Sequence, residues 1–177
     1  MKSICLPRLA SIAASAILLA STCAALAQTT ASDDDKKFVE AALKGGMSEV
    51  DLGNLAMKKG ASEDVKNFGQ MMVTDHTKLG DKMKVVAGDV GVTPPSMTTP
   101  SGIARKTELE VLSGNEFDKA YIGAMVKDHE ADLKAFKHEA ADGTSPEVKK
   151  AAHAGAMVVS RHLAMIRKIA QAHNITE

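Results

Sequence analysis

Apolar residues recur at steps of three and four residues along four long segments of this chain, which is the period of an α-helix. No stretch alternates between apolar and polar residues for long enough to compete as a β-strand. The four segments cover about residues 34–59, 62–88, 115–142 and 145 to near the C-terminus. The sequence therefore predicts an all-α protein built from four long helices.

Residues that start or stop helices mark the segment ends. Gly60 follows the first segment, and Ser62 precedes the second as an N-cap with acidic Glu63 in the first turn. The fourth segment opens with Ser145 as N-cap and Pro146 at the first helical position. These signals predict that the first and second helices, and the third and fourth, are joined by only a few residues.

The link between the second and third helices is much longer. It holds a Pro-rich stretch, residues 92–100, and then a short amphipathic helix at about 103–112. A helix of 26 residues is about 39 Å long, a length that about a dozen extended residues can cover. Two antiparallel hairpins joined by one long crossover are typical of the ferritin-like four-helix bundle, which is the predicted fold.

The N-terminus has the pattern of a secretory signal peptide: Lys2 and Arg8, an apolar run of about a dozen residues, and a small-x-small site that ends at Ala27. We expect residues 1–27 to be removed and residues 28–177 to form one domain, exported to the periplasm or the exterior. A lipoprotein anchored at Cys23 is a minor alternative. Cys5 and Cys23 both lie in the signal, so the mature chain offers no thiol for a disulfide or a metal.

The charges exclude some partners. Lys and Arg number 22 and Asp and Glu number 22, and the two signs are interspersed. Such a chain has neither the basic face that nucleic acids require nor a polybasic membrane patch. The apolar run of the signal is shorter than the ~20 residues of a membrane span. We expect no nucleic acid and no membrane span, and homo-oligomerisation stays open.

The pentapeptide Met-Val-x-Asp-His occurs twice, ending at Asp75-His76 and at Asp128-His129, each time within a helical segment. A buried imidazole or carboxylate is costly unless it is hydrogen-bonded, ion-paired or bound to a metal. The repeat therefore indicates either a structural hydrogen-bond network or a metal site.

One ionisable residue lies near the midpoint of the apolar face of each helix. On the first helix this face carries Phe38, Ala42, Gly45 and Leu52. The four midpoint residues are Glu49, His76, His129 and His162. Antiparallel packing would bring them into one central layer, so they are the predicted metal ligands. Asp75 and Asp128 lie at the margin, where they could orient a ligand imidazole on another helix as second-shell groups.

The alternative is a non-catalytic scaffold or interaction protein in which the Asp, His and Glu side chains satisfy one another without metal. Catalysis has little support, because no phosphate-binding loop, nucleophile elbow or serine accompanies the polar layer. An Asp-His pair alone lacks a nucleophile, so enzyme activity is not predicted.

The metal itself is open among iron, zinc, manganese and copper. Met72, Met125 and Met165 each lie one turn from one of the three layer histidines, and thioether with imidazole favours copper. Methionine is also the common gap filler of Ala-rich cores, so this signal is weak. Three further histidines, which lie away from the layer, are expected to be solvated: His138, His153 and His173.

The chain resembles a family of secreted bacterial proteins through Glu49, the two Asp-His pairs, His162 and the sequence Gly114-Asn115-Glu116-Phe117-Asp118. That family is a domain of unknown function, sometimes labelled as predicted outer-membrane proteins and placed with the ferritin-like fold. The likeness runs from about Phe38 past His162. It implies the fold and no established activity. The predicted central metal layer gives metal handling or envelope stress protection as the expected role.

Ferritin-like di-iron proteins carry Glu-x-x-His on two helices. Here Val73, Val126 and Val159 stand three residues before the layer histidines, so the carboxylate shell of a di-iron centre is absent. The sequence therefore favours a mononuclear, histidine-rich site or a metal-free relic of such a centre.

Overall fold

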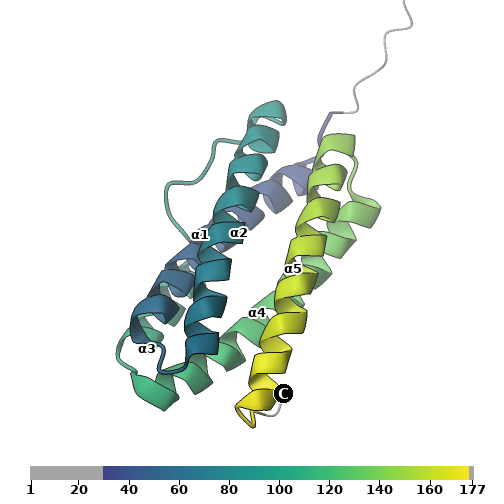
Figure 1. Cartoon of the computed structure of the whole chain (residues 1–177). Helices are drawn as coiled ribbons and strands as arrows, with labels where there is room; N and C mark the ends of the chain where they lie inside the picture. The colour runs from purple at the N-terminus through teal and green to yellow at the C-terminus, as the bar shows by residue number, and fades with distance from the viewer. Residues whose placement is uncertain (1–29, 176–177) are drawn as a thin grey trace, which may run out of the picture.

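A computed structural model describes residues 30–175, and the expected signal peptide at 1–27 lies outside the described residues. Over this range the chain forms five α-helices and no β-strand, which confirms the all-α prediction (Figure 1). The helices are α1 (Asp33–Lys59), α2 (Glu63–Asp89), α3 (Pro100–Glu110), α4 (Gly114–Asp142) and α5 (Pro146–Ala172).

The helices pair as two hairpins, α1 with α2 and α4 with α5, and these pack together as a four-helix bundle. The segment after α2 runs back along the outside of the bundle to α3, which packs against α1 and α4 (Figure 1). This long connection places the start of α4 beside the end of α1, where Gly60 and Gly114 form an isolated bridge. The predicted crossover is therefore observed.

Two buried aspartates hold the ends of the hairpins together. Asp35 of α1 accepts hydrogen bonds from the backbone N–H of Thr144 at 2.9 Å and of Ser145 at 3.3 Å. Asp118 of α4 accepts from the backbone N–H of Ala61 and of Ser62, both at 2.9 Å. The backbone N–H groups of each tight loop have no helical carbonyl within reach, so the carboxylate serves as their hydrogen-bond acceptor.

The helix starts agree with the sequence, with two differences. Ser145 caps α5 by accepting from the N–H of Val148 at 3.3 Å, as predicted. Ser62 occupies the N-cap position of α2 but makes no side-chain cap, because its hydroxyl donates to Asp118 instead. The short helix begins at Pro100, three residues earlier than predicted, because Thr99 accepts from the N–H of Gly102 and proline suits the first turn.

Two glycines bring the backbones of α1 and α2 into contact. A Cβ on Gly53 would lie 2.7 Å from the carbonyl oxygen of Gly69, and a Cβ on Gly69 would lie 2.7 Å from that of Gly53. Any larger residue at either position would push the two helices apart. This close approach fixes the register of α1 against α2 in the half of the hairpin next to its loop.

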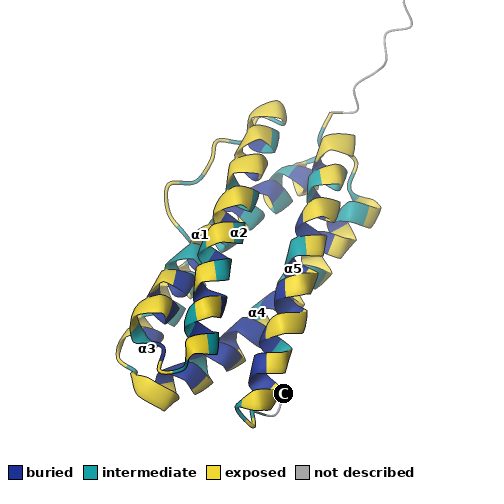
Figure 2. Ribbon diagram, viewed as in Figure 1, coloured by how far each residue is buried: buried dark blue, intermediate teal, exposed yellow. Residues whose placement is uncertain are grey.

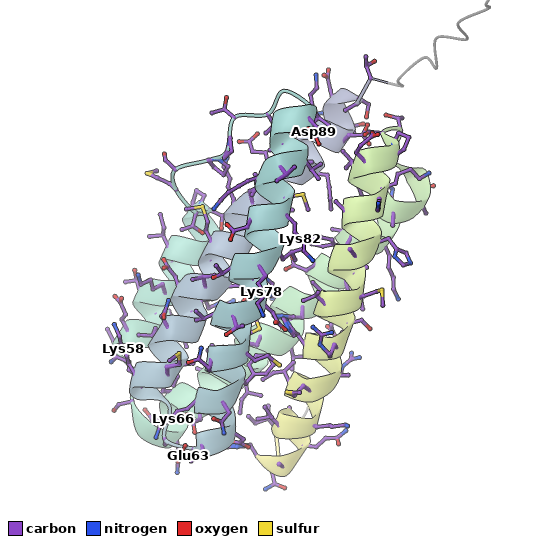
Figure 3. The ribbon with its side chains drawn as sticks, turned by 45° about the horizontal axis from the view of Figure 1, so that its top comes forward. Lys58, Glu63, Lys66, Lys78, Lys82 and Asp89 are labelled. Atoms are coloured by element: carbon purple, nitrogen blue, oxygen red, sulfur yellow. The ribbon has the colours of Figure 1, made fainter. Side chains whose placement is uncertain are left out.

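The interior consists of two hydrophobic clusters with a polar layer between them. One cluster surrounds Phe68, Tyr121 and Met125, and the other surrounds Leu43 and Phe136. The buried faces of the helices turn toward this interior in Figure 2. Figure 3 shows charged side chains along the outer side of α1 and α2, where Lys58, Lys78, Lys82 and Asp89 are exposed.

Within residues 30–175, no helix combines the length and the apolar character that a bilayer crossing requires.

Candidate metal centre

Three histidines from three helices meet in the polar layer. His76 of α2 is 4% exposed, and His129 of α4 and His162 of α5 are fully buried. Their ring centroids are 5.2 to 5.9 Å apart. One nitrogen of each ring lies within 4.8 Å of a nitrogen of the other two. The sequence predicted that these three side chains would converge, and the structure brings them together as what we call the three-histidine group.

Hydrogen bonds fix the tautomers of two rings. The Nδ1–H of His129 donates to the backbone carbonyl of Met125 at 2.9 Å, which leaves a lone pair on Nε2. The Nε2–H of His162 donates to Asp75 at 3.0 Å, which leaves a lone pair on Nδ1. These two bare nitrogens and Nε2 of His76 are buried and have no hydrogen-bond partner within the described chain. Unpartnered buried nitrogens on three neighbouring rings are a suitable ligand set for a metal ion.

The surroundings keep the imidazoles neutral. Burial lowers the pKa of His76 to about 3, with a further contribution from His162 and His129. Burial, followed by the effect of His162, lowers the pKa of His129 to about 4. The pKa of His162 is also lowered by burial, against the opposing effect of its hydrogen bond to Asp75. Neutral imidazole is the form that binds metals, so these rings need not lose a proton first.

Asp75 accepts a hydrogen bond from an imidazole on another helix, the contact that the sequence analysis expected of it. Its Oδ2 accepts the hydrogen bond from His162 across the interface between α2 and α5, and also one of 3.1 Å from Arg161. The hydrogen bond from His162 is the main cause that lowers the pKa of Asp75. An ionised carboxylate in this position holds the ring in one orientation and increases the basicity of its other nitrogen.

Glu49 is buried, as expected, but the structure does not place it in the three-histidine group. Burial raises its pKa well above the ordinary value, and the carboxyl groups of Asp132 and Asp128 add to this shift. Its Oε2 has no hydrogen-bond partner among residues 30–175. Glu49 therefore faces the carboxyl groups of α4 rather than the imidazoles.

The buried face of α1 differs from the predicted one near the start of the helix. Val39 and Leu43 are in the core, whereas Phe38 and Ala42, which the sequence analysis placed on the core face, are only partly buried. Phe38 packs against the edge of Phe136 of α4, with ring centroids 5.1 Å apart. The buried face of α1 therefore shifts along the helix, and Glu49 lies where this face adjoins the carboxyl groups of α4.

Asp128 differs from the expectation in the same way. It accepts no imidazole hydrogen bond in the described part of the chain and lines a hollow with Glu49 and Asp132. Burial raises its pKa, and the positive charge of Arg105 opposes the shift. Sequence analysis missed Asp132, whose pKa burial raises to about 6. Its position four residues after Asp128 was the available signal, because residues at this spacing share a helix face.

Aromatic rings close one side of the three-histidine group. The ring of Phe68 lies 6.3 Å from those of both His129 and His162. Tyr121 packs beside Phe68 and stacks on Phe117. Burial and the charge of Glu49 raise the pKa of Tyr121 well above its ordinary value. This side of the centre is apolar, so it excludes water and strengthens any charge interaction within.

The other histidines lie outside the centre. His138 and His153 are exposed, as predicted. The prediction for His173 was wrong, because its Nε2 lies 3.0 Å from Asp64 in the first turn of α2 and its side chain is only 25% exposed. This pair joins the C-terminal end of α5 to the start of α2.

The sequence profile of the domain of unknown function DUF4142 matches residues 20–169. The chain belongs to the DUF4142 family. This confirms the expected membership of a family whose name states no function. No curated protein matches the sequence of this DUF4142 chain significantly.

Three solved structures resemble this DUF4142 protein. A DUF305 fragment from Deinococcus radiodurans has a TM-score of 0.70 and 14% identity, over 79% of this chain and 97% of the other. A DUF305 protein from Streptomyces coelicolor, described as secreted, has a TM-score of 0.69 and 13% identity, over 81% and 96%. CopM in its Cu(I)-bound form has a TM-score of 0.65 and 16% identity, over 78% and 96%.

At such identities the likeness establishes the fold of the DUF4142 chain and nothing about its ligand. These structures are named for DUF305 and CopM, so the ferritin-like label stays a prediction from the sequence.

Proposed function

We propose that this protein is exported and binds one transition metal ion through His76, His129 and His162, as part of metal handling in the cell envelope. The observation that carries the proposal is the set of three buried imidazole nitrogens without hydrogen-bond partners. Leaving three such groups unsatisfied is unfavourable, and one ion would satisfy all of them. Trigonal or tetrahedral bonds of about 2.0–2.1 Å require ligand atoms about 3.4 Å apart, so the rings need to contract only modestly from their present spacing.

The ligand set favours copper or zinc over iron or manganese. Neutral imidazoles suit copper and zinc, whereas manganese prefers carboxylate and water oxygens. Glu49 was the carboxylate expected in the site, and it lies outside the three-histidine group. Without it, the site lacks the oxygen donors that would favour iron or manganese.

Charge favours Cu(I) in particular. The site is enclosed by buried apolar groups, and the nearest compensating charge is that of Asp75, which it shares with Arg161. Because the cost of burying an ion rises steeply with its charge, a monovalent ion fits better than a divalent one. The Cu(I)-bound state of CopM, a structural neighbour, adds support for the same ion.

The methionines support copper binding less than the sequence indicated. Met165 is 40% exposed, and Met72 and Met125 belong to the hydrophobic cluster around Phe68. We therefore assign the site to imidazole alone, with thioethers serving as packing.

Export rests on the signal-peptide pattern at residues 1–27 and on the DUF305 neighbour described as secreted. The role in metal handling rests on the three-histidine group. A Cu(I) or Zn²⁺ ion held by three buried imidazoles in the envelope would be kept from unwanted reactions. The protein would then store such an ion or protect the envelope from it.

The test is a titration of purified, tag-free protein with Cu(I) and separately with Zn²⁺, each against a chromogenic competitor chelator. We expect one ion per chain, loss of this binding in His129→Ala and retention in the control His153→Ala, which changes an exposed histidine. Absence of binding by the unaltered protein, or binding that survives His129→Ala unchanged, would overturn the proposal. The polar layer would then be a structural network.

A further inference from the structure

A hollow lined by carboxyl groups lies beside the three-histidine group, between α1, α3 and α4. It has a volume of about 250 Å³. Glu49 of α1 and Asp128 and Asp132 of α4 line it, and Arg105 of α3 is the one basic residue in its lining. Even with Glu49 protonated, the two aspartates outnumber Arg105, so the hollow attracts cations. We call this space the carboxyl hollow.

Glu49 shows that the carboxyl hollow is built to receive a polar or charged ligand. Its side chain is only 4% exposed, and its Oε2 has no hydrogen-bond partner among the described residues. A buried carboxyl group without a partner is unfavourable unless water or a cation enters to satisfy it. The acidic cluster on α4 thus faces an unsatisfied acceptor from the opposite helix.

A second, smaller space adjoins the carboxyl hollow and shares lining residues with it. This inner cavity has a volume of about 90 Å³, which is room for several water molecules, and His76 forms part of its wall. Asp132 and Gly45 line both spaces. Asp132 therefore stands between the carboxyl hollow and the histidine ligand supplied by α2.

Gly45 leaves space at the junction, which is where the carboxyl hollow and the smaller space adjoin. A Cβ built at this position meets no atom within 4 Å, so the absent side chain leaves free volume rather than a packed contact. Glycine in the middle of a helix costs stability relative to alanine, and nothing in the packing of α1 at this position requires it. The free volume lies where the two spaces meet.

We propose that the carboxyl hollow captures the metal cation and that Asp132 passes it to His76, so that Glu49, Asp128 and Asp132 form the loading path of the three-histidine group. This inference rests on the proposed metal binding. Carboxylate oxygens attract a soft or borderline cation but hold it weakly, whereas three imidazoles hold it more tightly. The ion therefore gains affinity when it moves from the carboxyl groups to the imidazoles. Glu49 releases its proton to water when it binds the ion and takes one up again when the ion leaves.

A second possible route to His76 is less favourable for a cation. Another hollow, between α1 and α2 beneath the crossover, also reaches His76. Its acidic residues are neutralised, because Asp81 lies 3.0 Å from Lys84 and Asp51 lies 3.5 Å from Lys106. Lys84 itself lines this hollow and repels cations. The carboxyl hollow has no comparable lysine in its lining.

The experiment loads the protein with Cu(I), supplied as its acetonitrile complex, and follows extraction by the chelator bathocuproine disulfonate through the absorbance of the copper complex. Asp132→Asn removes the charge at the junction, and Gly45→Leu fills the junction without changing charge. Gly123→Leu is the control, because Gly123 also has free space around it but lies exposed on α4, away from these cavities. Melting temperatures establish that each variant is folded.

We expect release and uptake of Cu(I) to slow by about tenfold or more in Asp132→Asn and in Gly45→Leu. The rates should not change in the control, and the equilibrium Kd should stay within about threefold in all three, since a path changes rates in both directions and leaves the end states alone. Higher ionic strength should slow uptake by the unaltered protein more than uptake by Asp132→Asn, because salt screens the carboxylates.

Unchanged rates in both test variants, with Cu(I) bound as tightly as before, would overturn the loading path and leave the metal site intact. A large loss of equilibrium affinity in Asp132→Asn would make Asp132 a ligand and would also overturn it. If the unaltered protein binds no Cu(I), the proposed function and the loading path both fail.

Discussion

The Oδ2 atom of Asp75 accepts a hydrogen bond of 3.0 Å from Nε2–H of His162 on the facing helix, and one of 3.1 Å from Arg161. The carboxylate is thus shared between a buried imidazole and a guanidinium that is more than half exposed. The hydrogen bond fixes the tautomer of His162 and leaves a lone pair on its buried Nδ1. It also brings a negative charge to the edge of a site that a cation would occupy.

The first prediction concerns this pair. Asp75→Asn should weaken Cu(I) binding 10–100-fold, because an amide can still accept the hydrogen bond but no longer supplies the charge that makes the ring a strong ligand. Asp128→Asn should change the equilibrium Kd by less than about threefold. Asp128 makes no hydrogen bond to any of the three imidazoles, and a 10–100-fold loss of affinity requires such a hydrogen bond to a ligand. Competition titrations of both variants measure this. Equal losses in the two would show that Asp75 has no special role.

The second prediction concerns stability in the presence of metal. A ligand that binds only the folded state stabilises it by about 2.7 kcal/mol at a free concentration one hundred times its Kd. We expect Cu(I) to raise the melting temperature of the unaltered protein by several degrees and to have no effect on His162→Ala. His138→Ala, which changes an exposed histidine, should respond like the unaltered protein. A metal-induced shift that persists in His162→Ala would contradict the assignment of this ligand.

The third prediction concerns pH. Burial, then the hydrogen bond with Asp35, then its negative charge raise the pKa of Glu139 to about 7. The unfolded chain loses this proton near the ordinary value of about 4.5. Between these two values the folded state binds more protons than the unfolded state, so stability is greatest below pH 4.5 and is lost as pH rises toward 7.

Glu139→Gln should remove this loss, because glutamine donates to Asp35 at every pH. The variant should therefore gain stability relative to the unaltered protein at pH 8 and show little difference at pH 4.5. Urea unfolding at the two pH values measures the free energies. A difference that does not depend on pH would show that Glu139 is already ionised in the folded protein.

The fourth prediction concerns the contact between α1 and α2. Gly69→Ala places a Cβ 2.7 Å from the carbonyl oxygen of Gly53 and 2.9 Å from the Cβ of Ala56. Crowding of this kind costs about 1–3 kcal/mol, more than the ~1 kcal/mol by which alanine is favoured in a helix. Gly123→Ala, which meets no neighbour, should stabilise the protein instead. Denaturant unfolding of both variants gives the two signs, and stabilisation by both would mean that the helices separate without cost.

The sequence determined the helices and the order in which they pack. The period of apolar residues, the caps at Ser145 and Gly60, and the unequal lengths of the connections are local properties, so four long helices and one crossover followed from them directly. The convergence of His76, His129 and His162 also followed, because each lies midway along a buried face and antiparallel helices bring their midpoints to one level.

Only the tertiary structure decided which way Glu49 and Asp128 face. Phe38 and Ala42 are only partly buried where the period placed them in the core, whereas Glu49 and Leu52 are buried as predicted, so the buried face of α1 shifts along the helix. Asp75 and Asp128 occupy the same place in a repeated motif, yet only Asp75 meets an imidazole, because α2 contacts α5 at that level. The periodicity of apolar residues predicts which face of a helix is buried, but not the direction of each side chain on that face. A metal site depends on that direction, which is decided by packing against the other helices.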